Sequence, residues 1–152
     1  MNSIYLNENG KMNKLKSVTY DLEADLQKII SDILKAEAPV SYDMVYKKTL
    51  MCFGMTRGGS SVKKAFENAF AQLSVPVSDV NETKFCWLSH EQIENYSLCR
   101  ITKGDGEKRS MDEIAPQEIA NGINIILADQ ISMNRADLIK ETSKLFKNRR
   151  CS

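Results

Sequence analysis

Few of the side chains that usually carry enzyme chemistry occur in this sequence, and they are not grouped. The single histidine, His90, lies in a polar stretch beside Glu91, where an imidazole is usually only solvated. No serine, threonine or cysteine has a recognisable base arranged around it. The cysteines are spread along the chain without a CxxC pair: Cys52, Cys86, Cys99 and Cys151. We therefore expect a binding protein rather than an enzyme, with no catalytic residue, no metal site and no cofactor.

The densest acidic group consists of Asp112, Glu113 and Glu118. These carboxylates precede and enter a predicted helix start, where the positive end of the helix dipole accounts for them without any chemistry. No spacing among the carboxylates resembles a metal-binding motif. Cys86 and Cys99 could face each other across a hairpin, but two reduced thiols are the expected state in a reducing compartment.

Side chains suited to phosphate and base contacts are concentrated in one stretch. They are the residues that the apolar stripe of a predicted helix leaves outward, together with the arginine before it: Arg57, Ser60, Ser61, Lys63, Lys64 and Asn68. The N-terminal part of the second helix of a helix-turn-helix makes contacts of this kind. A plain solvated helix face explains the same residues, and Glu67 interrupts the basic group. Lys147, Arg149 and Arg150 form a secondary basic patch, which is weaker evidence because helix C-termini attract cations anyway.

Two predicted helices separated by glycines position these side chains. Apolar residues at spacings of three and four mark one stripe in residues 42–53 and a cleaner one in residues 62–73. Gly54 should end the first helix in a left-handed conformation, and Ser41 should cap its start. Ser60 or Ser61 should cap the second helix. Two helices of any small α-rich domain fit this pattern as well as a helix-turn-helix does.

The hydrophobic period changes after these helices. The runs 85–88 and 96–101 predict two strands of a hairpin in the position of a wing, joined by the polar loop 89–95. Trp87 is predicted to be a core residue that seats the hairpin on the helices, because a lone tryptophan in a small domain is usually buried.

The ends of the domain are predicted from the same kind of signal. A stripe from Leu22 to Leu34 predicts the first helix, after a polar leader or linker over residues 1–18. Two helices close the chain, the first starting at Pro116, with Gly122 allowing close packing. The expected fold of residues 19–150 is therefore a single domain, mainly α with a small β-hairpin, winged-helix-like and followed by two C-terminal helices.

The whole chain sets limits on function. It has 152 residues with a net charge of +1, so any affinity for nucleic acid must come from local clustering of cations. No apolar run is long enough to cross a bilayer, and the N-terminus lacks the hydrophobic region of a signal peptide. We expect a cytoplasmic protein without membrane contact.

Several segments together are typical of a known family. They are Pro39-Val40-Ser41, then Thr56-Arg57-Gly58-Gly59-Ser60-Ser61-Val62, Phe85-Cys86-Trp87, Tyr96 with Arg100, Arg109 followed by Ile114-Ala115-Pro116-Gln117-Glu118-Ile119, and Arg135-Ala136-Asp137-Leu138-Ile139 with Glu141, Leu145 and Phe146. Over residues 22–150 the chain resembles the domain of unknown function 3320 family. This uncharacterised bacterial domain lies at the C-terminal end of proteins similar to superfamily I helicases, often near a segment similar to restriction endonucleases.

This resemblance implies an accessory module of a nucleic-acid enzyme rather than the motor itself, because no GxxxxGK[ST] motif occurs. The chain departs from the family pattern at Lys147-Asn148, where such sequences tend to have a glycine and an aromatic residue. The expected function is binding of DNA or RNA beside a helicase-like or nuclease-like protein, in cis or in trans. The alternative is a protein–protein interaction module on a winged-helix scaffold.

Overall fold

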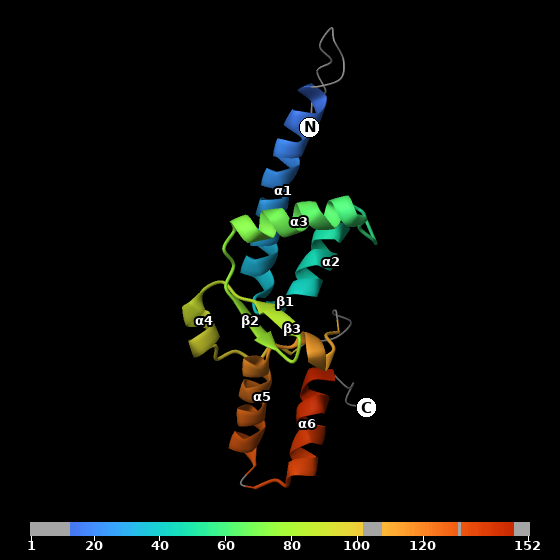
Figure 1. The fold of residues 1–152 in the computed structure, drawn as a ribbon. Coiled ribbons are helices and arrows are strands. Elements are labelled where there is room, and N and C mark those ends of the chain that lie inside the picture. Colours follow the sequence, from blue (N-terminus) through green and yellow to red (C-terminus); the bar gives the residue numbers. More distant parts are fainter. Residues whose placement is uncertain (1–12, 102–107, 131, 148–152) are drawn as a thin grey trace.

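The chain forms helices around a small antiparallel sheet (Figure 1). The computed structural model describes residues 13–101, 108–130 and 132–147, with side chains from residue 22 to residue 146. The elements in chain order are α1 (Asn13–Glu37), β1 (Val40–Ser41), α2 (Tyr42–Cys52), α3 (Ser60–Gln72), β2 (Val77–Val80), β3 (Thr83–Cys86), α4 (His90–Asn95), the 3-10 helix η1 (Met111–Glu113), α5 (Pro116–Asp129) and α6 (Arg135–Lys147).

The predicted fold class is confirmed: the chain is mainly α with a small antiparallel sheet, whose hairpin follows α2 and α3, and α5 and α6 come last in the described chain. The strands pair in the order β1-β3-β2, so β1, which precedes the helix-turn-helix, joins the hairpin that follows it. Helix α1 begins at Asn13, earlier than predicted, and residues 1–12 of the predicted leader lie outside the described residues. No described helix combines the length and the apolar character needed to span a membrane.

Local sequence explains how α2 starts and stops. The Ser41 hydroxyl accepts a hydrogen bond from the Met44 amide at 3.2 Å, which confirms the predicted cap. At the other end Gly54 has φ +69°, and the amides of Gly54 and Met55 donate to carbonyls of the last turn, as in a Schellman motif. The predicted serine cap of α3 is wrong. Gly59 is the N-cap residue, so Ser60 already lies inside the helix.

The hairpin lies earlier in the chain than predicted. It consists of β2 and β3, joined by the two-residue turn Asn81-Glu82, and both turn residues have positive φ. A turn of this kind matches the right-handed twist of the paired strands, and asparagine tolerates it well. The predicted loop 89–95 contains α4, which Ser89 caps through a hydrogen bond from the Gln92 amide at 3.1 Å.

Residues 96–101 form no strand, although their side chains alternate, because side chains of α5 take the place of a strand partner. The side-chain amide of Asn121 donates to the carbonyls of Tyr96 and Leu98 at 3.0 and 2.9 Å. The backbone N–H of Arg100 donates to the Glu118 carboxylate at 2.9 Å. Buried backbone groups need partners of some kind, and here they find them in an irregular segment held against a helix.

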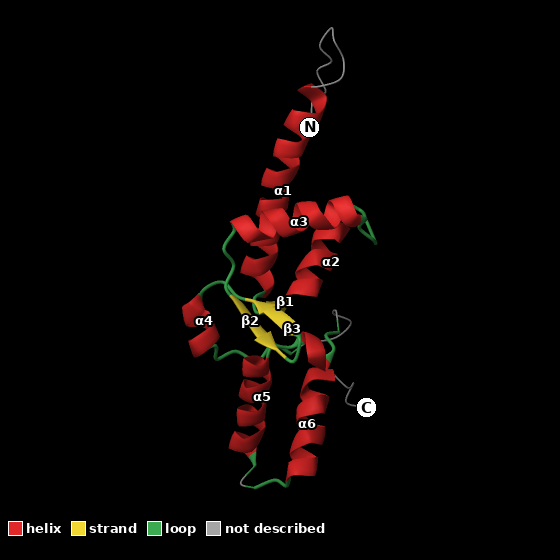
Figure 2. Cartoon of the chain, in the orientation of Figure 1, coloured by secondary structure: helices red, strands yellow, loops and turns green. Residues whose placement is uncertain are grey.

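The sheet lies between helices α1 to α3 on one side and α5 on the other (Figure 2). Two separate apolar cores pack against it. Cys86 packs on one side, into the core that α1, α2 and α3 build around Ile30 and Phe66. Phe85 and Trp87 pack with Ala115 on the other side. Neighbouring residues of a strand point to opposite faces, so β3 contributes to both cores. Trp87 is fully buried and donates to the Ser78 hydroxyl at 2.8 Å, which confirms the prediction that it is a core residue.

Helices α5 and α6 pack closely at Gly122, as the sequence predicted. A Cβ atom added there would lie 3.0 Å from Cε2 and Cζ of Phe146 and 3.1 Å from Cδ2 of Leu145. Gly122→Ala should therefore destabilise the protein by about 1 kcal/mol, because overpacking of roughly 1–3 kcal/mol outweighs the gain in helix propensity. Urea denaturation measures this change, with exposed Asn124→Ala on the same helix as the control. A stabilised Gly122→Ala variant would show that the two helices pack loosely.

Candidate nucleic-acid interface

The predicted contact residues lie together on the outer surface of the helix-turn-helix. We call them the α3 patch, and all of them are exposed: Arg57, Ser60, Ser61, Lys63, Lys64 and Asn68. Phe66 and Ala69 point into the core from the opposite side of the helix. Figure 1 shows α3 crossing α1 on the side of the sheet away from α5 and α6, with α1 extending beyond the crossing. No described element covers the patch in this arrangement.

Gly58 holds the loop before α3 close to α2. A Cβ atom at this position would lie 2.2 Å from the Tyr46 hydroxyl oxygen and 3.2 Å from Cδ2 of Leu50. The absence of a side chain therefore lets the loop approach α2, which fixes the position of Arg57 and of the first turn of α3. Tyr46 in turn packs edge-on against Phe66, with ring centroids 5.0 Å apart, so the patch is attached to the core through both helices.

The C-terminal half of α3 has different surroundings from the N-terminal half. Gln72 accepts a hydrogen bond from Gln27 at 2.6 Å and donates one to the Glu23 carboxylate, so its side chain bridges to α1. Glu67 is exposed in the middle of the helix, between the cationic first half and this bridge. The cationic part of the surface is therefore confined to the N-terminal half of α3 and the loop before it.

The secondary basic patch cannot be placed. Helix α6 ends at Lys147, and the Lys147 side chain and residues 148–152, including Arg149 and Arg150, lie outside the described residues. Lys144, one turn earlier, forms an ion pair with Glu141. His90 is exposed at the start of α4. Across the described parts of the chain, no group of three or more histidine, cysteine or acidic side chains could hold a metal ion.

Sequence reasoning missed a charge cluster centred on a buried carboxylate with two partly exposed arginines beside it. Glu118 lies in the first turn of α5, as predicted, but it is fully buried, so the helix dipole alone does not account for it. Arg100 donates to its carboxylate from Nε at 3.2 Å and Nη2 at 2.8 Å. Arg109 donates to the same carboxylate from Nη1 at 2.9 Å and Nη2 at 2.8 Å. We call these three residues the Glu118 cluster.

The Glu118 cluster connects distant segments. Arg100 also donates to the carbonyls of Glu37 and Pro39, at the end of α1 and the start of β1. Burial alone would raise the pKa of Glu118, but hydrogen bonds from Arg109 and Arg100 outweigh burial and hold it below the ordinary value. The same hydrogen bond raises the pKa of Arg109, although burial opposes this. The Glu118 carboxylate and the Arg109 guanidinium are therefore charged at neutral pH, and the cluster joins α1 and β1 to α5.

The signal for this cluster was present in the sequence, but only within the segments that carry the family resemblance. Arg100, Arg109 and Glu118 all belong to those segments, which have no periodicity that indicates burial of a charge. Comparisons of the chain with protein-family models, curated proteins and solved structures found no match. Membership of the domain of unknown function 3320 family therefore stays a prediction.

Proposed function

We propose that this chain is a non-catalytic accessory domain that binds DNA or RNA weakly through the α3 patch. The observation that carries the proposal is the exposure of cationic and polar side chains over the first half of the second helix of a helix-turn-helix. In helix-turn-helix proteins this part of the fold contacts phosphates and base edges. The family resemblance supports a helicase-like or nuclease-like protein as the partner, in cis or in trans.

Electrostatics limits the strength of this interaction. Arg57, Lys63 and Lys64 are the three cations of the patch, and the whole chain carries a net charge of only +1. Phosphate contacts supply most of the affinity of non-specific binding, which is typically about 10⁻⁴ to 10⁻⁶ M at physiological salt. We expect the domain to bind in this range, with a salt dependence that reflects about three phosphate contacts.

A second candidate function, protein interaction, is favoured by apolar side chains on the α5–α6 hairpin. Ile125, Leu127 and Ile139 are 49%, 41% and 57% exposed. Exposed apolar side chains of this kind are groups that a protein partner could cover. Helices α5 and α6 lie on the side of the sheet away from α3, so the two functions are compatible in one chain (Figure 1).

The double variant Lys63→Ala, Lys64→Ala tests the nucleic-acid proposal. Binding to labelled single- and double-stranded oligonucleotides, measured by fluorescence anisotropy at two salt concentrations, should weaken for all sequences alike. The slope of log affinity against log salt should fall by about two, because each lost phosphate contact removes about one. The matched control is Lys35→Ala, Lys140→Ala, which removes two exposed lysines outside the patch and should bind like the wild type.

Two results would contradict the proposal. Unchanged binding by the patch variant would move the interface elsewhere, first to Lys147, Arg149 and Arg150. No binding by the wild type at low salt, where electrostatic contacts are strongest, would leave protein interaction as the better candidate.

A further inference from the structure

A groove separates α3 from the hairpin. Its volume is about 600 Å³, and it lies between the start of α2, the middle of α3 and the outer end of β3. The residues that line it are Ser41, Tyr42, Asp43, Glu67, Phe70, Val77, Glu82, Thr83 and Lys84. None of the predicted contact residues of the α3 patch belongs to this set, so the groove is a separate surface.

One wall of the groove is an open strand edge. The pairing of β1 with β3 ends at Ser41 opposite Phe85, because the chain turns into α2 at Tyr42. Strand β2 continues along the other side of β3 as far as Thr83. Thr83 and Lys84 therefore have a strand partner on one side only within the described chain. In an antiparallel sheet, successive residues of a strand direct their N–H and C=O groups alternately toward its two neighbours. One of Thr83 and Lys84 therefore directs these groups toward the side of β3 that has no strand partner.

The remaining walls are apolar and aromatic. Tyr42 packs edge-on against Phe70, with ring centroids 4.9 Å apart, and both side chains are half-buried. Val77 is 38% exposed where β2 begins. An added strand places alternate side chains on opposite faces, so apolar side chains at every second position can rest against this surface.

The charges at the rim are mostly negative. Asp43, Glu67 and Glu82 face one cation, Lys84, and no ion pair joins any of the three carboxylates to a described residue. Burial raises the pKa of Tyr42, and the neighbouring charges of Glu67 and Asp43 add to this effect. The groove therefore repels phosphate and attracts cationic groups.

We infer that this groove docks an extended segment of a partner protein in which lysine or arginine alternates with apolar side chains. The segment takes the place beside Thr83 and Lys84 that β1 leaves vacant, and its backbone pairs with β3. Its cationic side chains lie near Asp43, Glu67 and Glu82, and its apolar side chains contact Phe70 and Val77. The charge of the groove excludes nucleic acid, so the domain can hold a protein here and nucleic acid at the α3 patch.

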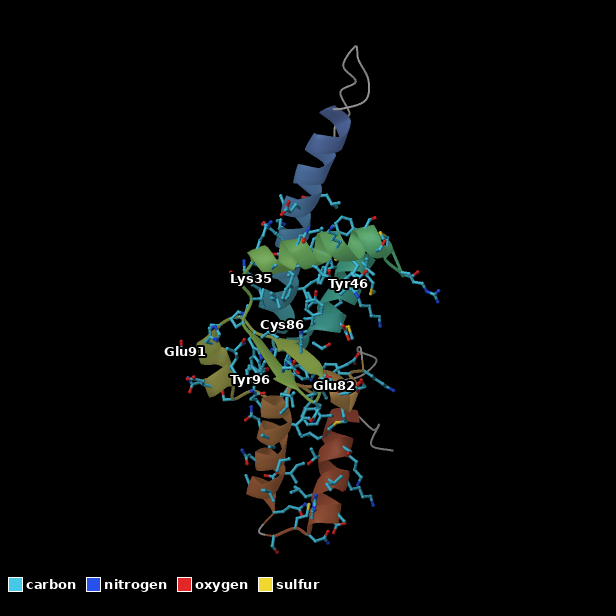
Figure 3. All side chains as sticks on the ribbon, viewed as in Figure 1. Lys35, Tyr46, Glu82, Cys86, Glu91 and Tyr96 are labelled. Carbon is cyan, nitrogen blue, oxygen red and sulfur yellow. The ribbon has the colours of Figure 1, made fainter. Side chains whose placement is uncertain are left out.

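The test uses a fluorescein-labelled peptide of three Lys-Val repeats with blocked ends. In anisotropy titrations the wild-type protein should bind it, and a peptide of three Glu-Val repeats should not bind. Glu67→Gln, Glu82→Gln should weaken binding roughly two- to thirtyfold, the range for loss of two exposed ion pairs. The matched control is Glu91→Gln, Glu94→Gln on α4, which should leave binding unchanged. Figure 3 shows that Glu91 and Glu82 lie on opposite sides of the sheet in this view.

Two further measurements separate this inference from its alternatives. A version of the Lys-Val peptide that is N-methylated at every residue should bind more weakly, because it has no backbone N–H donors for strand pairing. In amide-resolved NMR titrations the Lys-Val peptide should shift the signals of Thr83 and Lys84. Any one of three results would overturn the inference. The double variant Glu67→Gln, Glu82→Gln could bind the peptide as tightly as the wild type does, or the N-methylated peptide could bind as tightly as the unmodified one. An oligonucleotide, rather than the peptide, could shift the signals of Thr83 and Lys84. Lys63→Ala, Lys64→Ala should not weaken peptide binding, so the two proposals can fail independently.

Discussion

Replacing Glu118 by alanine is expected to destabilise the protein by about 3–5 kcal/mol, one of the two largest losses we expect from a single substitution. The change leaves the guanidinium groups of Arg100 and Arg109, whose side chains are 32% and 24% exposed, without their shared anion. An uncompensated buried charge costs far more than the net contribution of the intact cluster. Urea denaturation followed by circular dichroism measures the free energy of unfolding.

Exposed Glu94→Ala is the control, and we expect it to change the free energy of unfolding by less than about 0.5 kcal/mol. Glu118→Gln separates charge from shape, because the amide can accept hydrogen bonds from both arginines but carries no charge. We expect the free energy of unfolding of Glu118→Gln to lie between those of Glu118→Ala and the wild type. A loss below about 1 kcal/mol in Glu118→Ala would mean that water enters and solvates the two arginines.

The same cluster predicts how stability depends on pH. The folded-state pKa of Glu118 lies below its ordinary value of 4.5, so the unfolded chain binds this proton more readily than the folded chain does. The stabilisation from Glu118 is therefore complete above the ordinary pKa and is lost as pH falls through the lower folded-state pKa. Urea midpoints measured between neutral pH and about pH 3 should fall less steeply for Glu118→Gln than for the wild type. If the urea midpoints of the two proteins fall equally steeply with pH, Glu118 is not a source of the acid sensitivity.

Phe66→Ala should destabilise the protein by about 3–5 kcal/mol and unfold much of the population. Phe66 is 1% exposed, and its ring contacts those of Tyr42 and Tyr46, with centroids 5.5 and 5.0 Å away. Truncation therefore removes buried apolar surface and leaves a cavity between α2 and α3. A thermal melt, supported by chemical denaturation, gives the loss.

Phe53→Ala is the matched control, because Phe53 lies on the predicted stripe of α2 but is 39% exposed beyond the end of the helix. We expect its loss to be below about 1 kcal/mol. If the two variants lose similar stability, the apolar core is not centred on α3.

Local signals predicted the helices well, because helix periodicity and caps are properties of a few consecutive residues. Phe66, Gly54 and Ser41 all have their predicted roles. The hairpin was misplaced because alternation in residues 96–101 imitates a strand. Its partners are side chains on α5, which no local pattern indicates. The true hairpin had a weaker signal, an asparagine at the turn between two short runs.

The functional surfaces likewise include one that the sequence predicts and others that it does not. Helix periodicity predicts which side chains of α3 point outward, and all residues of the α3 patch are exposed. The Glu118 cluster depends on contacts between residues 18 positions apart and on carbonyls 61 and 63 positions from Arg100. The groove depends on β1 ending after two residues, which is visible only once the strands are paired. Contacts between distant residues decide both features, and a single sequence does not show them.

The position of β3 between two cores determines how the protein can be divided. A fragment that ended after α4 would retain the packing of Cys86 but would lose Ala115 from the surface that Phe85 and Trp87 bury. We therefore expect the elements before α5 and the two C-terminal helices to unfold together, in a single transition. We also expect a version shortened after α4 to expose Phe85 and Trp87 and to aggregate.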